Sequence, residues 1–362
     1  MRRPTPLSPR NLAAFQRRLL DWFRKHQRDL PWRRNKEPHR IWVAEVMLQQ
    51  TRIAAVVPYY HRFLRRFPNV ESLARASQED VLRLWSGLGY YRRARNMHRA
   101  ARQIVAHHGG RFPRDLGSAL QLPGTGRYTA AAVLSIAYDA PVAVLDGNVA
   151  RVLARIGAVR GNVHAPRHWR KLSDMAQHFL AADAPGNWNQ AMMELGETVC
   201  APQSPRCGAC PISRWCQARR LGLTHRIPAR QLKRASVNVK LAAAILRDPR
   251  GQTILVKYPG AHEHALFSRM WQFPAVEVSR QPKAELARHL RETMGFTPQS
   301  LEALPEARHG VTFRRITLLP FLARVRQLPK LAYARILPLS QISELPVSSA
   351  TRKIAAAAVV AR

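Results

Sequence analysis

The sequence predicts an all-α first half followed by a smaller α+β half. From Ser8 to about Pro228, apolar residues recur with helical spacing, and no alternating strand pattern interrupts them. The stretch RRLGLTHRIPARQLKRAS is then basic and poor in bulky apolar residues, and beyond it the period becomes that of strands. We therefore predict a helical domain over 1–220, a basic linker over 221–236 and a second domain over 237–362.

The first half contains a series of amphipathic helical segments. Ser8 and Pro9 are typical of an N-cap followed by proline in the first turn, and apolar residues then recur with helical spacing: Leu12, Phe15, Leu19, Trp22 and Phe23. Further helices are predicted at about 39–49, 52–66, 78–86, 91–107, 127–138, 146–157, 167–181 and 187–199.

The second half alternates strand and helix signals. VNVKLAAAILRDPRGQTILVKY predicts two strands around a turn at Asp248-Pro249-Arg250-Gly251. A helix at about 282–294 and a strand at 312–324 complete a small α+β domain.

The charge of the chain favours a polyanionic partner. The 362 residues carry 59 Lys and Arg against 22 Asp and Glu, a formal charge of +37, and the excess is spread along both halves. Such a surface suits nucleic acid or an anionic membrane.

The N-terminal residues are basic without a secretory apolar core, and no apolar run approaches the roughly eighteen residues that span a bilayer. We expect a soluble intracellular protein.

All four cysteines lie within seventeen positions, in a Cys-x6-Cys-x2-Cys-x5-Cys pattern: Cys200, Cys207, Cys210 and Cys216. A reducing compartment favours metal over disulfide. Zinc sites usually split their ligands into two close pairs with a long gap, whereas one compact loop can surround an iron–sulfur cluster. Iron–sulfur is therefore favoured, ahead of zinc and of a disulfide. Arg206 between the ligands suggests a rigid loop that presents basic groups to phosphate.

LPGTGRYTA places Gly124 and Gly126 just before a helix that begins near Arg127. Such glycines allow a tight turn whose backbone N–H groups bind an anion beside a helix N-terminus. An ordinary helix–helix turn is the alternative. Pro123 and the charge of the chain favour a helix-hairpin-helix, which grips DNA phosphates without reading sequence.

VLDGNVARVLARIG places Asp146 after an apolar run and at the start of a new helix. A simple N-cap would explain this carboxylate as well as a catalytic role would.

Together these residues resemble the iron–sulfur helix-hairpin-helix DNA glycosylases, and in particular the MutY-type adenine DNA glycosylases. The resemblance is dense from Leu30 to Cys216 and rests on LPWR, EVMLQQT, GLGYYRRARN, LPGTGRYTA, LDGNVARV, NQAMMELG and the cysteine spacing. It implies excision of adenine mispaired with 8-oxoguanine or guanine, and a [4Fe-4S] cofactor.

The resemblance implies that Glu45 protonates the adenine ring and that Asp146 stabilises the sugar cation, with Asn148 orienting Asp146 or water. Cleavage of an N-glycosidic bond needs both a proton for the leaving base and negative charge near the oxocarbenium. The apolar neighbours of Glu45 indicate a partly buried helix, although a solvated carboxylate is the alternative.

Position 128 separates two kinds of relative. Relatives of the endonuclease III type, which also nick the strand, carry a lysine there that forms a Schiff base with the sugar. Tyr128 cannot do so, although its phenol can hydrogen-bond near the carboxylates. We predict a monofunctional glycosylase that leaves an abasic site.

The target base must leave the helical stack, which requires a pocket and a side chain to fill the gap. By resemblance, Trp32, Arg33 and Gln190 line the adenine pocket, while Gln50 and Tyr90 lie near the opposite base. Trp32 and Tyr90 could instead be core aromatics.

The second half resembles, more thinly, the MutT-like (Nudix) domain with which this family recognises 8-oxoguanine, through LFSRMWQFPAVEV. A Nudix hydrolase needs several glutamates for magnesium, and only Glu292 remains in HLRETMGF, so we predict no nucleotide hydrolysis. The family's usual Phe-Ser-His triplet aligns with Phe313, Arg314 and Arg315. Serine and histidine would hydrogen-bond to the altered edge of 8-oxoguanine, whereas two arginines offer mainly positive charge. This predicts weaker discrimination between 8-oxoguanine and guanine, unless His309 takes the place of the missing histidine.

The expected partner is double-stranded DNA that contains an adenine mispair, bound by a monomer with no membrane contact. The location would be the cytoplasm and nucleoid in a bacterium, or the nucleus or mitochondria in a eukaryote.

Two other functions compete: a bifunctional endonuclease III-like glycosylase and lyase, and a non-catalytic iron–sulfur DNA-binding protein or redox sensor. Tyr128 argues against the first, and the presence of Glu45 and Asp146 argues against the second.

Overall fold

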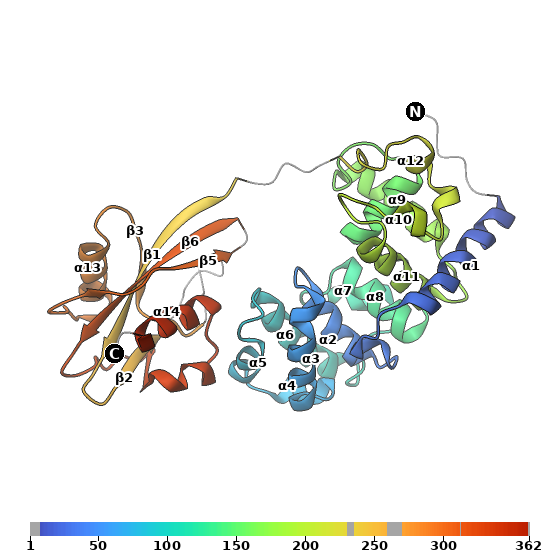
Figure 1. Cartoon of the computed structure of the whole chain (residues 1–362). Helices are drawn as coiled ribbons and strands as arrows, with labels where there is room; N and C mark the ends of the chain where they lie inside the picture. Colours follow the sequence, from blue (N-terminus) through green and yellow to red (C-terminus); the bar gives the residue numbers. More distant parts are fainter. Residues whose placement is uncertain (1–7, 230–234, 259–269, 312, 361–362) are drawn as a thin grey trace. The chain divides into compact units, whose positions relative to one another are not determined.

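The computed structural model describes residues 8–229, 235–258, 270–311 and 313–360. The chain forms two compact units (Figure 1). The first comprises Met1–Arg75 and Asn96–Leu232, and the second comprises Ala76–Arg95 and Lys233–Arg362. No helix in the described ranges is long and apolar enough to cross a membrane.

In the described residues of the first unit, helices are the only regular secondary structure, so the predicted all-α class is confirmed. Its helices are α1 (Pro9–His26), η1 (Pro31–Arg33), α2 (Pro38–Leu48), α3 (Ile53–Arg66), α4 (Val70–Arg75), α6 (Arg92–His107, which begins in the second unit), α7 (Leu116–Gln121), α8 (Arg127–Tyr138), α9 (Gly147–Ile156), α10 (Pro166–Phe179), α11 (Pro185–Thr198), η2 (Cys207–Ala209), η3 (Ser213–Trp215) and α12 (Gln217–Arg220).

Helices α2, α8 and α11 form the centre of this unit. Helix α2 begins at Pro38, and the Glu37 side chain accepts hydrogen bonds from the first backbone N–H groups of the helix. From Ile41 to Met47 every side chain of α2 is buried, which marks a helix enclosed on all sides. It packs against α3 and α8, and α8 packs against α11. A polar side chain on these helices is therefore held rigidly.

The second unit contains a mixed sheet, so the predicted α+β class is also confirmed. Its elements are α5 (Gln78–Trp85), β1 (Val237–Arg247), β2 (Gln252–Val256), β3 (Ala275–Val278), α13 (Pro282–Met294), β4 (Glu302–Ala303), β5 (Ala307–Val311), β6 (Arg314–Arg324), β7 (Ala334–Pro338), η4 (Leu339–Glu344) and α14 (Ser349–Val360). The strand order is β4-β6-β1-β2-β7, with β3 paired to β1 and β5 to β6. Strands β1 and β6 run parallel, and the other pairs are antiparallel.

A helix covers each face of this sheet (Figure 1). Alternate residues of β1 point to opposite faces, so Ala242 and Ala244 meet Leu286 and Leu290 of α13 on one side. On the other side, Ile245 shares a core with residues of α14.

The predicted strand–turn–strand around 248–251 is confirmed. The Gly251 N–H donates to the Asp248 carbonyl at 3.0 Å, and Gly251 has φ 74°. The helix at 282–294 is confirmed as α13. The strand at 312–324 is β6, although residue 312 lies outside the described residues, as do residues 266–269 of the LFSRMWQFPAVEV segment. The remaining short strands and α14 were not predicted.

Segment Ala76–Arg95 groups with the second unit. Within that unit the Ser86 hydroxyl donates to the Val347 carbonyl at 2.6 Å, and Glu79 accepts from Trp271 Nε1 at 3.1 Å. These contacts join residues distant in sequence, which no local pattern indicates. The linker proposed at 221–236 stays a prediction.

Candidate active site

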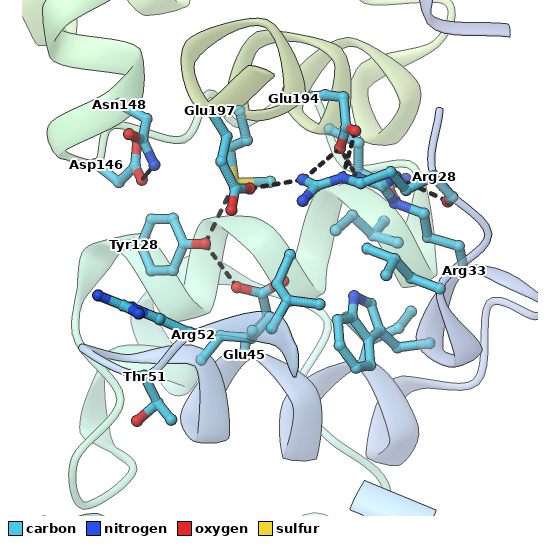
Figure 2. A pocket seen from close by; sticks show the side chains of 18 residues that line it. Arg28, Arg33, Glu45, Thr51, Arg52, Tyr128, Asp146, Asn148, Glu194 and Glu197 are labelled. Atoms are coloured by element: carbon cyan, nitrogen blue, oxygen red, sulfur yellow. Dashed lines mark hydrogen bonds and ion pairs between the residues drawn. The ribbon is translucent and has the colours of Figure 1, made fainter. Parts of the chain in front are cut away.

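A cavity of about 190 Å³ in the first unit collects the expected catalytic and adenine-pocket residues (Figure 2). Its walls come from η1, α2, the start of α3, α8, the start of α9 and α11. The expected residues that line it are Trp32, Arg33, Glu45, Tyr128, Asp146, Asn148 and Gln190.

Glu45 lies on α2 and is only 4% exposed. Tyr128 Oη donates a hydrogen bond of 2.7 Å to Glu45 Oε2. Burial raises the pKa of Glu45 to about 7, and the negative charge of Asp146 raises it further. The Tyr128 hydrogen bond and the charge of Arg33 lower it, but they do not cancel the effect of burial. Near neutral pH, Glu45 can therefore hold a proton and donate it.

Tyr128 lies in the first turn of α8, directly after the glycine turn. Burial, followed by the charge of Glu45, raises the pKa of Tyr128 well above its ordinary value, so the phenol keeps its proton. Its oxygen also lies 3.2 Å from Met193 Sδ. No lysine lines this cavity in the described part of the chain.

Asp146 is both the N-cap of α9 and part of the cavity wall. One carboxylate oxygen accepts from the Val149 N–H at 2.7 Å, and the other accepts from Asn148 Nδ2 at 3.2 Å. Burial raises the pKa of Asp146, and the hydrogen bonds from the Val149 and Asn148 backbones oppose this shift. Asn148 Oδ1 in turn accepts from Arg151 at 2.9 Å, and Arg151 also donates to the Cys200 carbonyl at 2.9 Å.

A carboxylate–arginine network occupies the opposite flank of the cavity (Figure 2). The Glu194 side chain is 1% exposed and accepts from Arg28 at 2.6 and 3.0 Å and from Arg33 at 2.8 Å. Arg28 also reaches Glu197 at 2.6 Å, and Arg33 donates to Gln190 at 3.2 Å. Burial favours a raised pKa, but the two arginines outweigh it and hold the pKa of Glu194 below its ordinary value.

The sequence interpretation missed Arg28, Glu194 and Glu197, as well as Arg52, which also lines the cavity. A signal for Glu194 was present, because it follows Gln190 by four positions on one helix, and residues at that spacing share a face.

Trp32 is at once a core residue and a wall of the cavity. It is 7% exposed, and its ring meets that of Tyr60 edge to face at a centroid distance of 5.3 Å. The other apolar walls are Leu30, Ile41, Leu48, Ile53 and Ile136. A cavity with apolar walls and a few fixed polar groups suits a flat heterocycle.

Two residues expected near the opposite base lie outside the cavity. Gln50 follows α2, is exposed and has φ 56°, while Tyr90 belongs to the second unit, is 42% exposed and has φ 49°. Positive φ at a residue other than glycine is unfavourable, and such residues cluster at functional sites. Their roles stay predictions.

The glycine turn precedes α8 as expected. Gly124 has φ 77°, and a Cβ added there would lie 2.6 Å from the Cβ of Asn96, so only glycine fits. Gly126 is the N-cap of α8, and Arg127 is exposed in the first turn of the helix. This places the first backbone N–H groups of α8 and a cation at one helix end, which suits a phosphate.

The four cysteines are free thiols that line one small cavity together with Arg155. In the described residues, no three ligating side chains come close enough to hold a single metal ion. Burial raises the pKa of Cys210 to about 12, so this thiol would ionise only on a metal. A donor set of four thiols around one space fits an iron–sulfur cluster better than a lone zinc ion.

Two arginines hold the cysteine loop. Arg155, which the sequence interpretation missed, is 2% exposed and donates to Cys200 Sγ at 3.2 Å, to three carbonyls of the loop and to the Ile227 carbonyl at 2.8 Å. Arg206 donates to the Thr198 carbonyl at 2.5 Å, which anchors its guanidinium at the base of the loop.

In the second unit, Arg314 and Arg315 begin β6. Arg315 is exposed, and the Arg314 guanidinium lies 5.9 Å from the centre of the Phe313 ring. His309 lies on the neighbouring strand β5, opposite Ile316, and is half-buried.

Comparison with known proteins agrees with this geometry. Residues 43–179 match the model of the HhH-GPD superfamily of base excision DNA repair proteins. The adenine DNA glycosylase of Rattus norvegicus is 35% identical over 97% of this chain and 80% of its own length. A thermostable thymine-DNA glycosylase of known structure has 26% identity and a TM-score of 0.53 over 58% of this chain and 97% of its own. The structural neighbours also include a MutT protein from Methanosarcina mazei Go1, with 17% identity and a TM-score of 0.30 over 35% of this chain and 94% of its own. By its similarity along nearly its whole length, the chain belongs to the adenine DNA glycosylases of the HhH-GPD superfamily.

Proposed function

We propose that this protein hydrolyses the N-glycosidic bond of adenine mispaired with 8-oxoguanine or guanine in double-stranded DNA and leaves an abasic site. The observation that carries this proposal is the placement of two differently held carboxylates, Glu45 and Asp146, in one cavity. Glu45 has a pKa of about 7 and a phenol donor at 2.7 Å, while Asp146 is fixed by a helix N-terminus and an amide.

Glu45 is the general acid in this mechanism. Its proton passes to a ring nitrogen of adenine as the bond between C1′ and the base breaks, so the base leaves neutral and the sugar becomes an oxocarbenium ion. The Asp146 carboxylate stabilises that cation at close range. Water then adds to C1′, and its proton returns to the Glu45 carboxylate. Asn148 holds Asp146 in place during these steps.

Tyr128 supports this role and limits the chemistry. As a donor to Glu45, it orients the carboxyl group and prevents its pKa from rising further. It carries no amine, so it cannot form the imine that strand cleavage requires. The product is therefore an intact strand with an abasic site.

The base enters the cavity beside Trp32, while Gln190 and Arg33 present polar groups to its edge. Arg33 is held by Glu194, so its guanidinium keeps one orientation. The extruded nucleotide would leave a gap in the duplex, beside which Gln50 and Tyr90 would lie.

Cys200, Cys207, Cys210 and Cys216 would hold a [4Fe-4S] cluster. When bound, the cluster acts as a structural cross-link of the loop that follows α11. Arg155 would keep Cys200 oriented through its hydrogen bond to the sulfur. The glycine turn with Arg127, together with the formal charge of +37, would bind the DNA backbone, and Arg206 would contribute through the loop that it anchors.

The second domain would contact the strand opposite the adenine through Phe313, Arg314 and Arg315. Arginines bind phosphates and guanine acceptors without requiring the altered edge of 8-oxoguanine. We therefore propose a modest preference for 8-oxoguanine over guanine. A dissociation constant lower by no more than about threefold for the 8-oxoguanine duplex would support this, and a preference of about a hundredfold would contradict it.

The decisive experiment for the activity is release of free adenine from a duplex with adenine opposite 8-oxoguanine, without alkali or heat. Wild type should release adenine and leave the strand intact, while Asp146→Asn should be slower by at least about a hundredfold. Borohydride should trap no covalent complex. A folded, cluster-loaded wild type that releases no adenine would overturn the proposal.

A further inference from the structure

Three arginines line the cavity, and two of them are paired with carboxylates. Arg28 and Arg33 form ion pairs with Glu194, and Arg28 also pairs with Glu197. Their charges are neutralised inside the protein, so they have little attraction left for an anionic ligand.

Arg52 differs from both. It is exposed, it lines the same cavity, and in the described part of the chain its guanidinium forms no ion pair or hydrogen bond. It is the residue just before α3, and its own side chain does not cap that helix. Figure 2 shows its side chain running past Tyr128, on the opposite side of the cavity from Arg28 and Arg33.

The two carboxylates without a paired arginine, Glu45 and Asp146, also line the cavity. Neither forms an ion pair with Arg52, and no other described residue neutralises the charge of Arg52. Among the described residues that line it, the cavity therefore has acidic groups inside and an unpaired arginine, Arg52, on its exposed side.

A nucleotide extruded from DNA has the complementary arrangement. Its neutral base and its sugar enter the cavity, where the developing positive charge needs carboxylates, while its two flanking phosphodiesters remain outside. An arginine is well suited to a phosphate, because its planar guanidinium donates two parallel hydrogen bonds.

We propose that Arg52 forms a phosphate-binding subsite at the mouth of the cavity and holds one of the two phosphodiesters that flank the extruded nucleotide. This inference rests on the proposed function, since it takes the occupant of the cavity to be a nucleotide. Arg52 makes its contact in the ground state as well as in the transition state, so it contributes to binding more than to the bond-breaking step.

The test pairs a protein change with a DNA change. Binding is measured to a duplex with 2′-fluoro-2′-deoxyadenosine, which resists cleavage, opposite 8-oxoguanine. Each flanking phosphate is replaced in turn by an uncharged methylphosphonate, and each duplex is bound by wild type and by Arg52→Gln. On the unmodified duplex, Arg52→Gln should weaken binding about tenfold, the effect expected of a charge-assisted hydrogen bond.

At one of the two phosphates, the losses of binding free energy caused by methylphosphonate and by Arg52→Gln should not add, because each change removes the same contact. Arg52→Lys should restore part of the affinity. The slope of log affinity against log salt should fall by about one in Arg52→Gln.

Arg18 provides a matched control. It is exposed on α1 and does not line the cavity. Any loss of binding free energy in Arg18→Gln should therefore add to the loss caused by methylphosphonate at both phosphates. Additive effects of Arg52→Gln at both positions would overturn the subsite. Because binding is measured on an uncleaved duplex, the result is independent of adenine release, and failure of the proposed activity would be recognised separately.

Discussion

Two glutamates in one cavity have similar burial and opposite ionisation. The Glu45 residue is 4% exposed and the Glu194 side chain 1% exposed. Glu45 accepts a hydrogen bond from a phenol and lies near the carboxylate of Asp146, and burial raises its pKa to about 7 although the charge of Arg33 opposes the shift. For Glu194, burial also favours a raised pKa, but Arg28 and Arg33 outweigh it, and the pKa stays below its ordinary value. The partner, rather than the depth, decides which glutamate can act as an acid and which is a structural anion.

The largest expected effect comes from removing the proton of Glu45. Glu45→Gln should slow single-turnover adenine release by about a thousandfold, because the variant lacks the carboxylic acid that protonates the leaving base. Binding to an uncleavable duplex should change by less than about threefold. A release rate within tenfold of wild type would show that the acid is another group.

Breaking the Glu194 pairs should mainly affect folding. Glu194→Gln should lower the free energy of unfolding by about 3 kcal/mol, because it leaves the buried guanidinium of Arg33 without a counter-ion and Arg28 with Glu197 alone. Glu197→Gln is the matched control, because Glu197 is 45% exposed and shares only Arg28. Its cost should stay below about 1 kcal/mol. The free energy of unfolding of both variants can be measured in urea. Equal losses would contradict the distinction between a buried structural anion, Glu194, and an exposed one, Glu197.

Glu45 should also reduce stability at neutral and alkaline pH. Its folded pKa of about 7 lies above the ordinary value of 4.5, so the folded protein binds the proton more tightly than the unfolded chain. The resulting stabilisation is complete below pH 4.5 and disappears as the pH rises through 7. Glu45→Gln, which does not titrate, should therefore be more stable than wild type by about 3 kcal/mol at alkaline pH and about equal at acidic pH. A difference independent of pH would contradict this.

The smallest effect concerns Tyr128. Its hydrogen bond lowers the pKa of Glu45, so Tyr128→Phe should move the alkaline fall of adenine release to higher pH. The rate at neutral pH should change by less than about tenfold. Borohydride trapping should remain negative in wild type and in this variant. An unshifted profile would indicate that the phenol does not act on Glu45.

Much of the fold could be predicted from the sequence because its long elements have strong periodicity. The helices of the first half, the turn at 248–251 and the helix at 282–294 all have local signals, namely apolar spacing, proline at a helix start and glycine at a turn. Strand β4 has two residues and β3 has four, too few for any period to be read. The grouping of Ala76–Arg95 with the second unit depends on tertiary contacts, which leave no mark on a linear pattern.

The site was predictable in its residue types but not in its electrostatics. EVMLQQT and LDGNVARV identified Glu45 and Asp146 through resemblance, and the structure places both in one cavity. No sequence pattern could show that Arg28 and Arg33 converge on Glu194, because Arg28 and Glu194 lie 166 positions apart. Nor could it show that Arg52 is left without a partner among the described residues, since that depends on which acidic groups other arginines occupy.

The most direct test is the titration of Glu45 itself. The carbonyl stretch of the protonated carboxyl can be followed by infrared difference spectroscopy with 13C-labelled glutamate, using Glu45→Gln to identify the band. A band present in wild type, absent from Glu45→Gln and lost with a midpoint near pH 7 would establish the proton donor that the cavity geometry implies. A midpoint near the ordinary value of 4.5 would leave Glu45 ionised at neutral pH and would contradict its role as the general acid.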